Sequence, residues 1–559
     1  MRYSYITGIG IVSLILFAFY FRLASYELLN INEGLYAEIA REMVVTRDYI
    51  LPQLNFILYI EKPPLLYWLI ASSFKVLGTD VFAARFVTAS CGVLTCLALI
   101  GFGFKLNQIK LGYLAAIIVA TSLGFQIIMR MVFFDPLLTV CLTIGLLSFY
   151  VWHEKSEILY VRIFYFFLGL AVLTKGFVGL VLPGGIVVFF MLAARTPWIK
   201  WRQFFDWIGI ILFLAVVLPW HIMMALQHKD FLWRYLIEEQ FLRFLHEREP
   251  QDYHTGPWYY YFPRILVYLF PWSCLLPLLF IKTPSPQPPY CKGKSLTLFL
   301  WLWFLVPLIF FSISIAKGDY YMVIGVPPLA LLLAMRLEEC RGRLLVLLLW
   351  ILFLGGLYLA PHFIPLKHAV ALTPLLPLWK AIFWIVLVVG IFSFLLSLPG
   401  SFRAKQFKRL RSLTMITKGG HLFLLGIIFF SLLYIFTSIK SQLQDNGSEI
   451  TIGNYINSHL KGKMIYLYED FEEFSTVLFY VRQRMPIINS KSADLAYGKQ
   501  FAPKEWFLST KEFNKIAMEK PIYIIILKDK ISQLSKDFHV LSESTSTALM
   551  SNEVMPVKE

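Results

Sequence analysis

Charged residues are scarce in this sequence: Asp, Glu, Lys and Arg make up 15% of its 559 positions, whereas 58% are hydrophobic. A soluble chain of this length does not need so much apolar surface, so the composition excludes an ordinary soluble protein and predicts a polytopic membrane protein. The formal net charge is +16, but the basic residues lie in short loops between apolar runs. Positive cytoplasmic loops explain this pattern, so we expect membrane lipids and no nucleic acid as partners.

Cysteine is also scarce, and its spacing predicts neither a disulfide framework nor a metal site. The six cysteines lie in apolar runs or in loops that we expect inside the cell: Cys91, Cys96, Cys141, Cys274, Cys291 and Cys340. The sequence lacks an internal repeat, which argues against the symmetric halves typical of transporters. It also lacks a small-residue cleavage site after the first apolar run, so we expect an uncleaved first span.

Apolar runs predict about thirteen membrane-spanning helices within residues 1–440. They lie at 6–24, 82–104, 111–129, 131–152, 160–174, 177–194, 204–224, 260–281, 296–315, 320–335, 344–360, 375–398 and 419–439. The loops between them alternate between basic and non-basic, which places 25–81 and 225–259 on the outer side of the membrane. Residues 441–559 follow the last span and belong to that same side. We therefore expect an all-α polytopic membrane protein of the bacterial inner membrane.

The segment 441–559 differs abruptly in composition from the apolar chain before it. Runs at 464–469, 485–489 and 521–528 are typical of strands, and helical patterns lie between them. The length and the alternation predict a small soluble α/β domain, which the topology places in the periplasm. We find no recognisable catalytic motif in it.

A polar segment from Asn32 to Pro64 is the most informative stretch of the chain. Its first part, NEGLYAEIAREM, predicts a helix with one apolar face and one charged face, which should lie flat in the membrane interface. Its last part is Glu61-Lys62 followed by two prolines, which hold a carboxylate and an ammonium group in an extended turn. The segment thus brings acid, base and cation to the surface where a lipid-linked substrate would present its head group.

Further ionisable residues are expected at span ends on the same outer side, where such groups tend to be functional or paired. They are Glu33, Asp135, Lys175, His254, Lys317 and Asp319. Each has an alternative explanation. Asp135 is equally suited to cap a helix, Lys175 to snorkel to the interface, and a lone histidine such as His254 is more often structural than a metal ligand.

The motifs of the first outer loop resemble those of a known family. The order YAEIAREM, DYI-x-P, YIEKPPLLYW and AARF is similar to the first loop of the bacterial aminoarabinose transferases. These enzymes belong with the protein mannosyltransferases in the C-type superfamily of polyprenyl-phosphate-dependent glycosyltransferases. The later motifs FFDPLL, LTKGFVGLVLP, HTGPWYYY and KGDYY match in the same order, so the resemblance covers about residues 1–440.

The resemblance implies an enzyme that transfers a sugar, with 4-amino-4-deoxy-L-arabinose as the first choice, from undecaprenyl phosphate to lipid A or another envelope glycan. The resemblance implies that the donor phosphate is bound by Lys62, Tyr59, Tyr36, Tyr321 and Lys317. It implies that a divalent ion (Zn, Mg or Mn) is bound by Glu61 and His254, and that the catalytic residues are Glu33 and Asp135. A hexose transferase of the same fold and a transporter of lipid-linked sugars are the alternatives.

Two residues depart from the family pattern: Asn32 stands where the family has an aspartate, and Leu35 where it often has an arginine. Asn32 cannot accept a proton. A hydroxyl acceptor needs a general base, whereas a phosphate acceptor is already anionic and needs none. The sequence therefore favours a phosphate acceptor, or a base role for Glu33 or Asp135.

Overall fold

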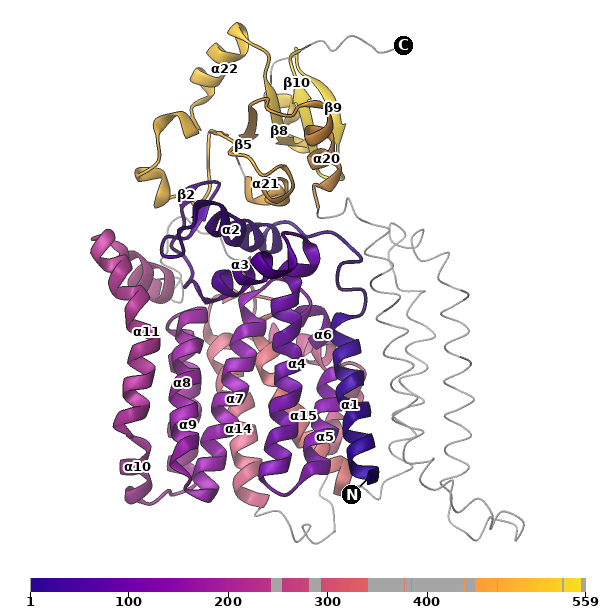
Figure 1. Cartoon of the computed structure of the whole chain (residues 1–559), viewed down its shortest axis with the longest axis vertical. Helices are drawn as coiled ribbons and strands as arrows, with labels where there is room; N and C mark the ends of the chain where they lie inside the picture. The colour runs from indigo at the N-terminus through magenta and orange to yellow at the C-terminus, as the bar shows by residue number, and fades with distance from the viewer. Residues whose placement is uncertain are drawn as a thin grey trace.

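The computed structural model describes residues 2–242, 254–280, 293–339 and 448–553, except 470, 535 and 536, together with the single positions 377, 384, 434 and 437. Before residue 340, most of the described residues form long helices that run side by side as a bundle (Figure 1). Their buried apolar faces join in one hydrophobic core. The elements are α1 (Arg2–Tyr20), α4 (Val81–Lys105), α5 (Ile109–Ala120), α6 (Leu123–Met129), α7 (Phe134–Lys155), α8 (Ile158–Lys175), α9 (Val178–Ala193), α10 (Trp198–Phe204), α11 (Trp207–Gln227), η1 (Trp233–Leu242), β3 (His254–Thr255), α13 (Tyr261–Tyr268), η2 (Trp272–Leu279), α14 (Gly293–Ile313), β4 (Ala316–Lys317), η3 (Tyr321–Gly325) and α15 (Val326–Glu339).

Five described helical segments are long and apolar enough to cross a membrane, and the number rises to seven if two bent helix pairs each form one span. These segments overlap the apolar runs that predict spans in the same part of the chain. Shorter apolar helices, among them α9 and the end of α1, occupy further predicted runs. The predicted spans at 344–360, 375–398 and 419–439 lie outside the described residues.

Local sequence explains where the helices bend and separate. The α5–α6 pair bends by 73° at Thr121 and Ser122, whose hydroxyls donate to carbonyls of the preceding turn. The run from 160 to 194 forms two helices, α8 and α9, which separate at Gly176 with φ +60° and ψ −133°. Only glycine adopts this conformation readily, so the chain turns there and leaves Lys175 at the mouth of the bundle.

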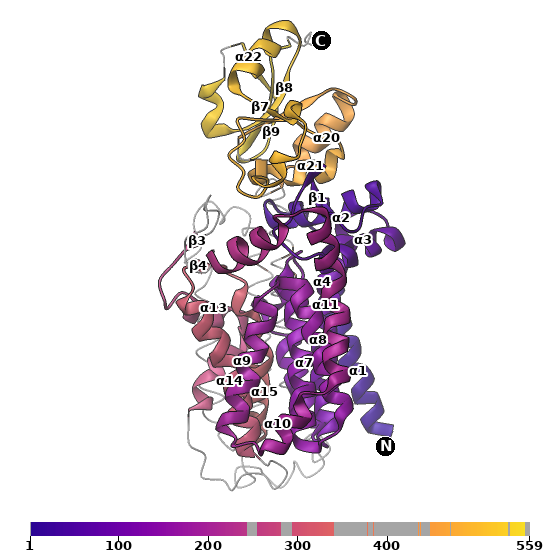
Figure 2. The ribbon, with the colours of Figure 1, turned by 90° about the vertical axis from the view of Figure 1, so that its left-hand side faces the viewer.

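The first loop lies across one end of the bundle, between the bundle and the C-terminal domain (Figures 1 and 2). It contains α2 (Asn32–Thr46), the hairpin strands β1 (Gln53–Leu54) and β2 (Ile57–Leu58), and α3 (Leu65–Leu77).

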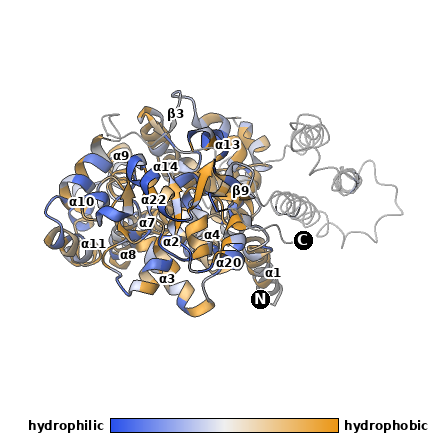
Figure 3. Ribbon diagram, turned by 90° about the horizontal axis from the view of Figure 1, so that it is seen from above, coloured by the Kyte–Doolittle hydropathy of each residue, from blue (hydrophilic) through white to orange (hydrophobic). Residues whose placement is uncertain are grey.

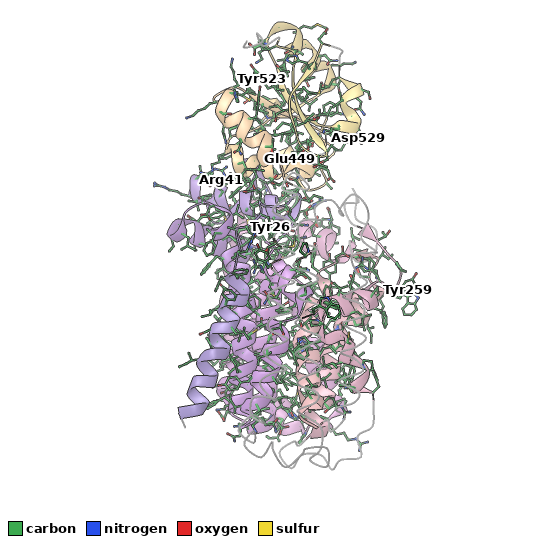
Figure 4. All side chains as sticks on the ribbon, turned by 90° about the vertical axis from the view of Figure 1, so that its right-hand side faces the viewer. Tyr26, Arg41, Tyr259, Glu449, Tyr523 and Asp529 are labelled. Carbon is green, nitrogen blue, oxygen red and sulfur yellow. The ribbon has the colours of Figure 1, made fainter. Side chains whose placement is uncertain are left out.

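Helix α2 forms as predicted, but its charged face is buried within the protein. Glu38, Arg41 and Glu42 are all buried. Arg41 donates to both oxygens of Glu38 at 2.7 Å, and Glu42 accepts from the backbone N–H of Phe56 at 2.8 Å. The C-terminal domain lies over this helix, and Figure 4 shows Arg41 just below that domain. The sequence of α2 could not show this cover, so the expectation of an interfacial charged face was wrong.

Residues 448–553 form a small α/β domain around a six-stranded sheet with strand order β7-β6-β5-β8-β10-β9. Strands β5 to β8 are parallel, whereas β10 is antiparallel to both β8 and β9. Seen from above, this domain with its largely hydrophilic α22 covers the bundle (Figure 3). The elements are α20 (Ile450–His459), β5 (Ile465–Tyr468), η8 (Phe471–Phe474), α21 (Thr476–Val481), β6 (Ile487–Ile488), η9 (Gly498–Gln500), η10 (Lys504–Trp506), β7 (Phe507–Leu508), α22 (Thr510–Glu519), β8 (Tyr523–Leu527), η11 (Lys528–Gln533), β9 (His539–Glu543) and β10 (Thr547–Ser551).

Buried hydrogen bonds attach this domain to the first loop. Asn30 accepts from the backbone N–H and hydroxyl of Thr476 at 3.1 and 2.8 Å. Asn55 and the backbone of Met485 exchange two bonds of 2.7 and 3.0 Å. Gly34 packs so closely that a Cβ there would meet the Thr476 nitrogen at 2.7 Å. These contacts fix the position of the domain over the mouth of the bundle.

Candidate functional site

A cavity of about 660 Å³ lies where the helix bundle, the first loop and the C-terminal domain meet. The first loop contributes residues from Ile31 to Pro63, and the bundle contributes the ends of α7, α8 and α14 and the turn that follows α14. The C-terminal domain contributes residues 472–473 and 491–494. Seven of the nine residues predicted for the site line this cavity.

Glu61-Lys62-Pro63 reaches the cavity because the following Pro64 ends the loop and α3 begins at Leu65. The Lys62 side chain is half-buried. No hydrogen bond or ion pair joins it to another residue of the described chain, whereas the other lysines of the cavity wall are engaged. Among the lysines of this wall within the described residues, Lys62 is therefore the one whose ammonium group is available to an anionic ligand.

Asp135 lies in the first turn of α7 and Lys175 at the last residue of α8. Their side chains form a buried ion pair of 2.7 Å. The Lys175 ammonium also lies 4.1 Å from the centre of the Tyr321 ring. The N-cap residue of α7 is Phe133 and not Asp135, so the structure favours the pairing role of Asp135 over the capping alternative. Because α7 and α8 are adjacent and antiparallel, residues 40 apart in sequence meet at the cavity.

Lys317 lines the cavity, but its ammonium group is engaged elsewhere. It donates to the backbone carbonyls of Phe311 and Ser312 at 2.8 and 2.9 Å, at the end of α14. Lysine is suited to this position because the last carbonyls of a helix lack partners and carry a partial negative charge. Burial lowers the pKa of Lys317. Its observed contacts are those of a helix cap rather than of a phosphate ligand.

Three of the predicted donor-site residues are tyrosines in the cavity wall. Tyr36 donates its hydroxyl to Asn32 Oδ1 at 3.0 Å. Tyr321 contacts the Lys175 ammonium with its ring. Tyr59 is 2% exposed, and burial, with the nearby carboxylates of Asp494 and Glu61, raises its pKa well above the usual range. Tyr59 therefore stays neutral and can act only as a hydrogen-bonding group.

Glu33 lies outside the cavity lining, contrary to its predicted base role. Its carboxylate accepts two bonds from Arg85, at 2.9 and 2.8 Å, and one from each of the backbone N–H groups of Leu29 and Val132, both at 3.0 Å. Both oxygens are occupied and the side chain is 1% exposed. These contacts leave it no access to an acceptor, so the geometry assigns Glu33 to holding the first loop against α4.

Glu61 and His254 are the predicted metal ligands. Glu61 lines the cavity and is 4% exposed. The backbone of His254 pairs with that of Lys317, a cavity residue, through β3 and β4. The His254 side chain lies outside the described residues. Within the described chain, no three His, Cys, Asp or Glu side chains gather as metal ligands do.

Sequence analysis assigned no role to the cavity residues of the C-terminal domain. These are Glu472, Glu473, Lys491, Ser492, Ala493 and Asp494. They are more than 400 positions from Lys62, and no motif links the two regions. One signal was available: these residues follow the predicted strands 464–469 and 485–489, and ligands of open α/β sheets bind at the carboxyl ends of parallel strands.

Comparison with known proteins shows that the chain is similar, in sequence and in fold, to glycosyltransferases that use polyprenyl-type phosphate carriers. Residues 61–223 match the family described as dolichyl-phosphate-mannose-protein mannosyltransferase. An undecaprenyl phosphate-alpha-4-amino-4-deoxy-L-arabinose arabinosyl transferase of Aeromonas hydrophila is 31% identical over 309 residues, which are 54% of this chain and 55% of the relative. One from Pseudomonas fluorescens is 28% identical over 376 residues, covering 62% and 64% of the two chains. The chain thus spans little more than half the length of the curated relatives it matches.

The likeness in fold extends over nearly the whole chain. The crystal structure of ArnT from Cupriavidus metallidurans bound to undecaprenyl phosphate has a TM-score of 0.76 and 19% identity, with 98% of both chains covered. The same protein in the apo state has a TM-score of 0.77 and 20% identity. The predicted fold class, a polytopic helical protein with a small C-terminal α/β domain, is therefore confirmed.

Proposed function

We propose that this protein, a multi-pass membrane protein with the fold of the aminoarabinose transferases, is a glycosyltransferase. It transfers a sugar, 4-amino-4-deoxy-L-arabinose in the first instance, from undecaprenyl phosphate to lipid A or another envelope acceptor. The relatives named above support this donor, because their names contain both the sugar and the carrier.

One observation carries the proposal: the cavity holds the Lys62 ammonium, which has no ion-pair partner among the described residues, beside the Asp135–Lys175 pair. Breaking the bond between the sugar and the carrier leaves a phosphate with growing negative charge. A fixed cation at that oxygen stabilises the transition state more than the substrate, and this is the usual source of the largest rate enhancement. Lys62 is placed to do this because, within the described residues, no hydrogen bond or ion pair engages its ammonium group.

The acceptor is a phosphate rather than a hydroxyl in this proposal. Of the motif carboxylates that sequence analysis offered as base, Glu33 is engaged by Arg85, and Asp135 is paired with Lys175. Asn32 lines the cavity and already accepts the Tyr36 hydroxyl. A phosphate acceptor attacks in its anionic form and needs no proton removed, so it suits a site whose two motif carboxylates, Glu33 and Asp135, are both paired. If a hydroxyl is the acceptor, Asp135 is the remaining motif base.

A divalent ion at Glu61 and His254 stays a proposal. Glu61 faces the cavity and the His254 backbone lies at its edge, beside Lys317. Such an ion would supply Lewis-acid stabilisation of the departing phosphate. No step above depends on it.

The location in the bacterial inner membrane, with the cavity and the C-terminal domain in the periplasm, is also a proposal. It rests on the basic loops, which include 403–418 just before the last predicted span. A reporter that is active only in the periplasm, fused after Glu559, should be active. Activity of a cytoplasmic reporter at that position would invert the orientation and remove the outer-face site.

Transport of a lipid-linked sugar is the rival function. Transporters place their substrate at the ends of broken helices. The two bent helix pairs, α5–α6 and α13–η2, contribute no residue to the cavity described here. The bends therefore give the transport alternative no support at this site.

The direct test uses the purified full-length protein with undecaprenyl-phosphate-linked aminoarabinose and lipid A, and mass spectrometry of the lipid A product. The expected result is addition of the amino sugar, which Lys62→Ala abolishes without changing folding or membrane insertion. Lys62→Arg should restore it only in part, because a planar guanidinium binds phosphate differently from a compact ammonium. Near-normal turnover of Lys62→Ala would show that the donor site is elsewhere, and a hexose donor tested in parallel covers the alternative sugar.

A further inference from the structure

The two C-terminal segments that reach the cavity both begin where a parallel strand ends. Strands β5 and β6 are neighbours, with Leu467 opposite Ile487. The chain passes from β5 to β6 and β7 on one side and returns to β8 on the other side of β5. The carboxyl end of β5 is therefore a switch point of the sheet, the position at which open α/β sheets bind ligands. Here that edge faces the cavity.

Glu469, the first residue after β5, connects these segments. It is 3% exposed, and its Oε1 accepts from Asn489 at 2.8 Å and from Lys491 at 3.0 Å. Its Oε2 accepts from Lys530 at 2.8 Å. Burial alone would raise the pKa of Glu469, but the two lysines outweigh it and lower the pKa. The carboxylate is therefore ionised and binds three side chains from two segments, the loop 489–494 and η11.

The backbone at this edge is held in an unfavourable conformation. Glu469 has φ +55° and Asn489 has φ +50°, values that residues other than glycine adopt rarely. Their N–H groups donate to the Ile488 and Leu508 carbonyls at 2.9 and 2.7 Å, which keeps both residues in place. Conformations of this kind persist where the surroundings over-determine them, and they gather at ligand sites.

The loop 489–494 is anchored at three of its residues and also lines the cavity. Asn489 and Lys491 bind Glu469, and Ser492 donates to Glu472 and accepts from the backbone N–H of Leu495 at 3.0 Å. The Lys491 side chain is nevertheless 61% exposed and lines the cavity. The loop thus presents polar side chains in a fixed arrangement to a ligand that enters the cavity.

The donor lipid has a direction in this cavity. Its polyprenyl chain must lie in the bilayer, so its phosphate at Lys62 leaves the sugar pointing away from the membrane, toward the C-terminal domain. Sugars are bound by polar side chains that are already in position, because flexible ones lose entropy on binding.

On this geometry, and resting on the proposed function, we propose that loop 489–494 recognises the sugar of the donor. Lys491 and its neighbours contact the sugar, and Glu469 is the positioning residue that holds them. The phosphate is bound by a different part of the chain, around Lys62. Affinity for the sugar and affinity for the carrier should therefore be separable by mutation.

The test compares two lipids on the purified full-length protein: undecaprenyl phosphate alone and the same carrier bearing aminoarabinose. Glu469→Gln should weaken binding of the sugar-bearing donor about tenfold, since misplaced contacts of this kind are costly, and leave the bare carrier within about twofold. Lys62→Ala should weaken both lipids. Lys491→Met should act like Glu469→Gln, and it is exposed enough not to affect folding.

The matched control is Glu543→Gln, which makes the same chemical change in the same domain. Glu543 pairs with Lys528 at 2.9 Å and is not part of the cavity wall, so both affinities should stay unchanged. Equal weakening of both lipids by Lys491→Met, or no weakening, would overturn the inference. Failure of Lys62→Ala to weaken the bare carrier would instead contradict the proposed function, so the two failures are distinguishable.

Discussion

Glu33→Gln separates a structural role of this residue from a catalytic one. The change keeps the size of the side chain but removes a charge that faces Arg85, which is fully buried on α4. The amide nitrogen of glutamine would also be a hydrogen-bond donor, and it would face the N–H groups that donate to Glu33 in the native protein. Removing one partner of a buried ion pair leaves an uncompensated charge and costs about 3–5 kcal/mol. Glu33→Gln should therefore lower the thermal midpoint strongly, while the protein that remains folded turns over substrate at a nearly normal rate.

The assay is thermal unfolding of the detergent-purified protein, together with turnover per folded molecule at a temperature well below the transition. The double variant Glu33→Gln/Arg85→Met removes both charges and should recover part of the lost stability, because a buried pair replaced as a whole costs little. A variant with unchanged thermal midpoint but turnover reduced about a hundredfold or more would refute the reasoning, since that is the loss expected of a general base.

Three further outcomes are expected. Asn32→Asp places a carboxylate in the cavity, and it should leave transfer to a phosphate acceptor unchanged or slower, whereas a clear gain in rate would indicate a hydroxyl acceptor. Burial and the adjacent Glu38 raise the pKa of Glu42 well above its usual value, so the folded state binds this proton more tightly than the unfolded state. The free energy of unfolding should then fall as pH rises from the pKa of Glu42 in the unfolded state through its pKa in the folded state. Glu42→Gln should flatten that decline when thermal midpoints are measured over a series of pH values. An unchanged slope would contradict this expectation. If Glu61 and His254 hold a divalent ion, a chelator should abolish transfer and one of Zn, Mg or Mn should restore it, with Glu61→Gln needing more metal; full activity after exhaustive chelation would exclude a required ion.

The sequence by itself determined the class of the protein, because membrane-spanning helices must satisfy their own backbone and be apolar over a fixed length. It also named seven residues that line the cavity. Lys62, Glu61 and Asp135 stand in short motifs next to prolines or helix ends, so local sequence places them at a span mouth. The strands of the C-terminal domain at 465–468, 487–488 and 523–527 likewise follow local β-branched runs.

Only the tertiary structure decided what each of these groups contacts. Glu33 and Arg85 are 52 positions apart, so no local pattern could show that they are paired. The cover over α2 and the cavity wall at 489–494 come from a domain more than 400 positions away from Asn32. Such contacts depend on the complementary shape and hydrogen bonding of surfaces that meet only after folding, and the hydrophobic period of a helix carries no information about them.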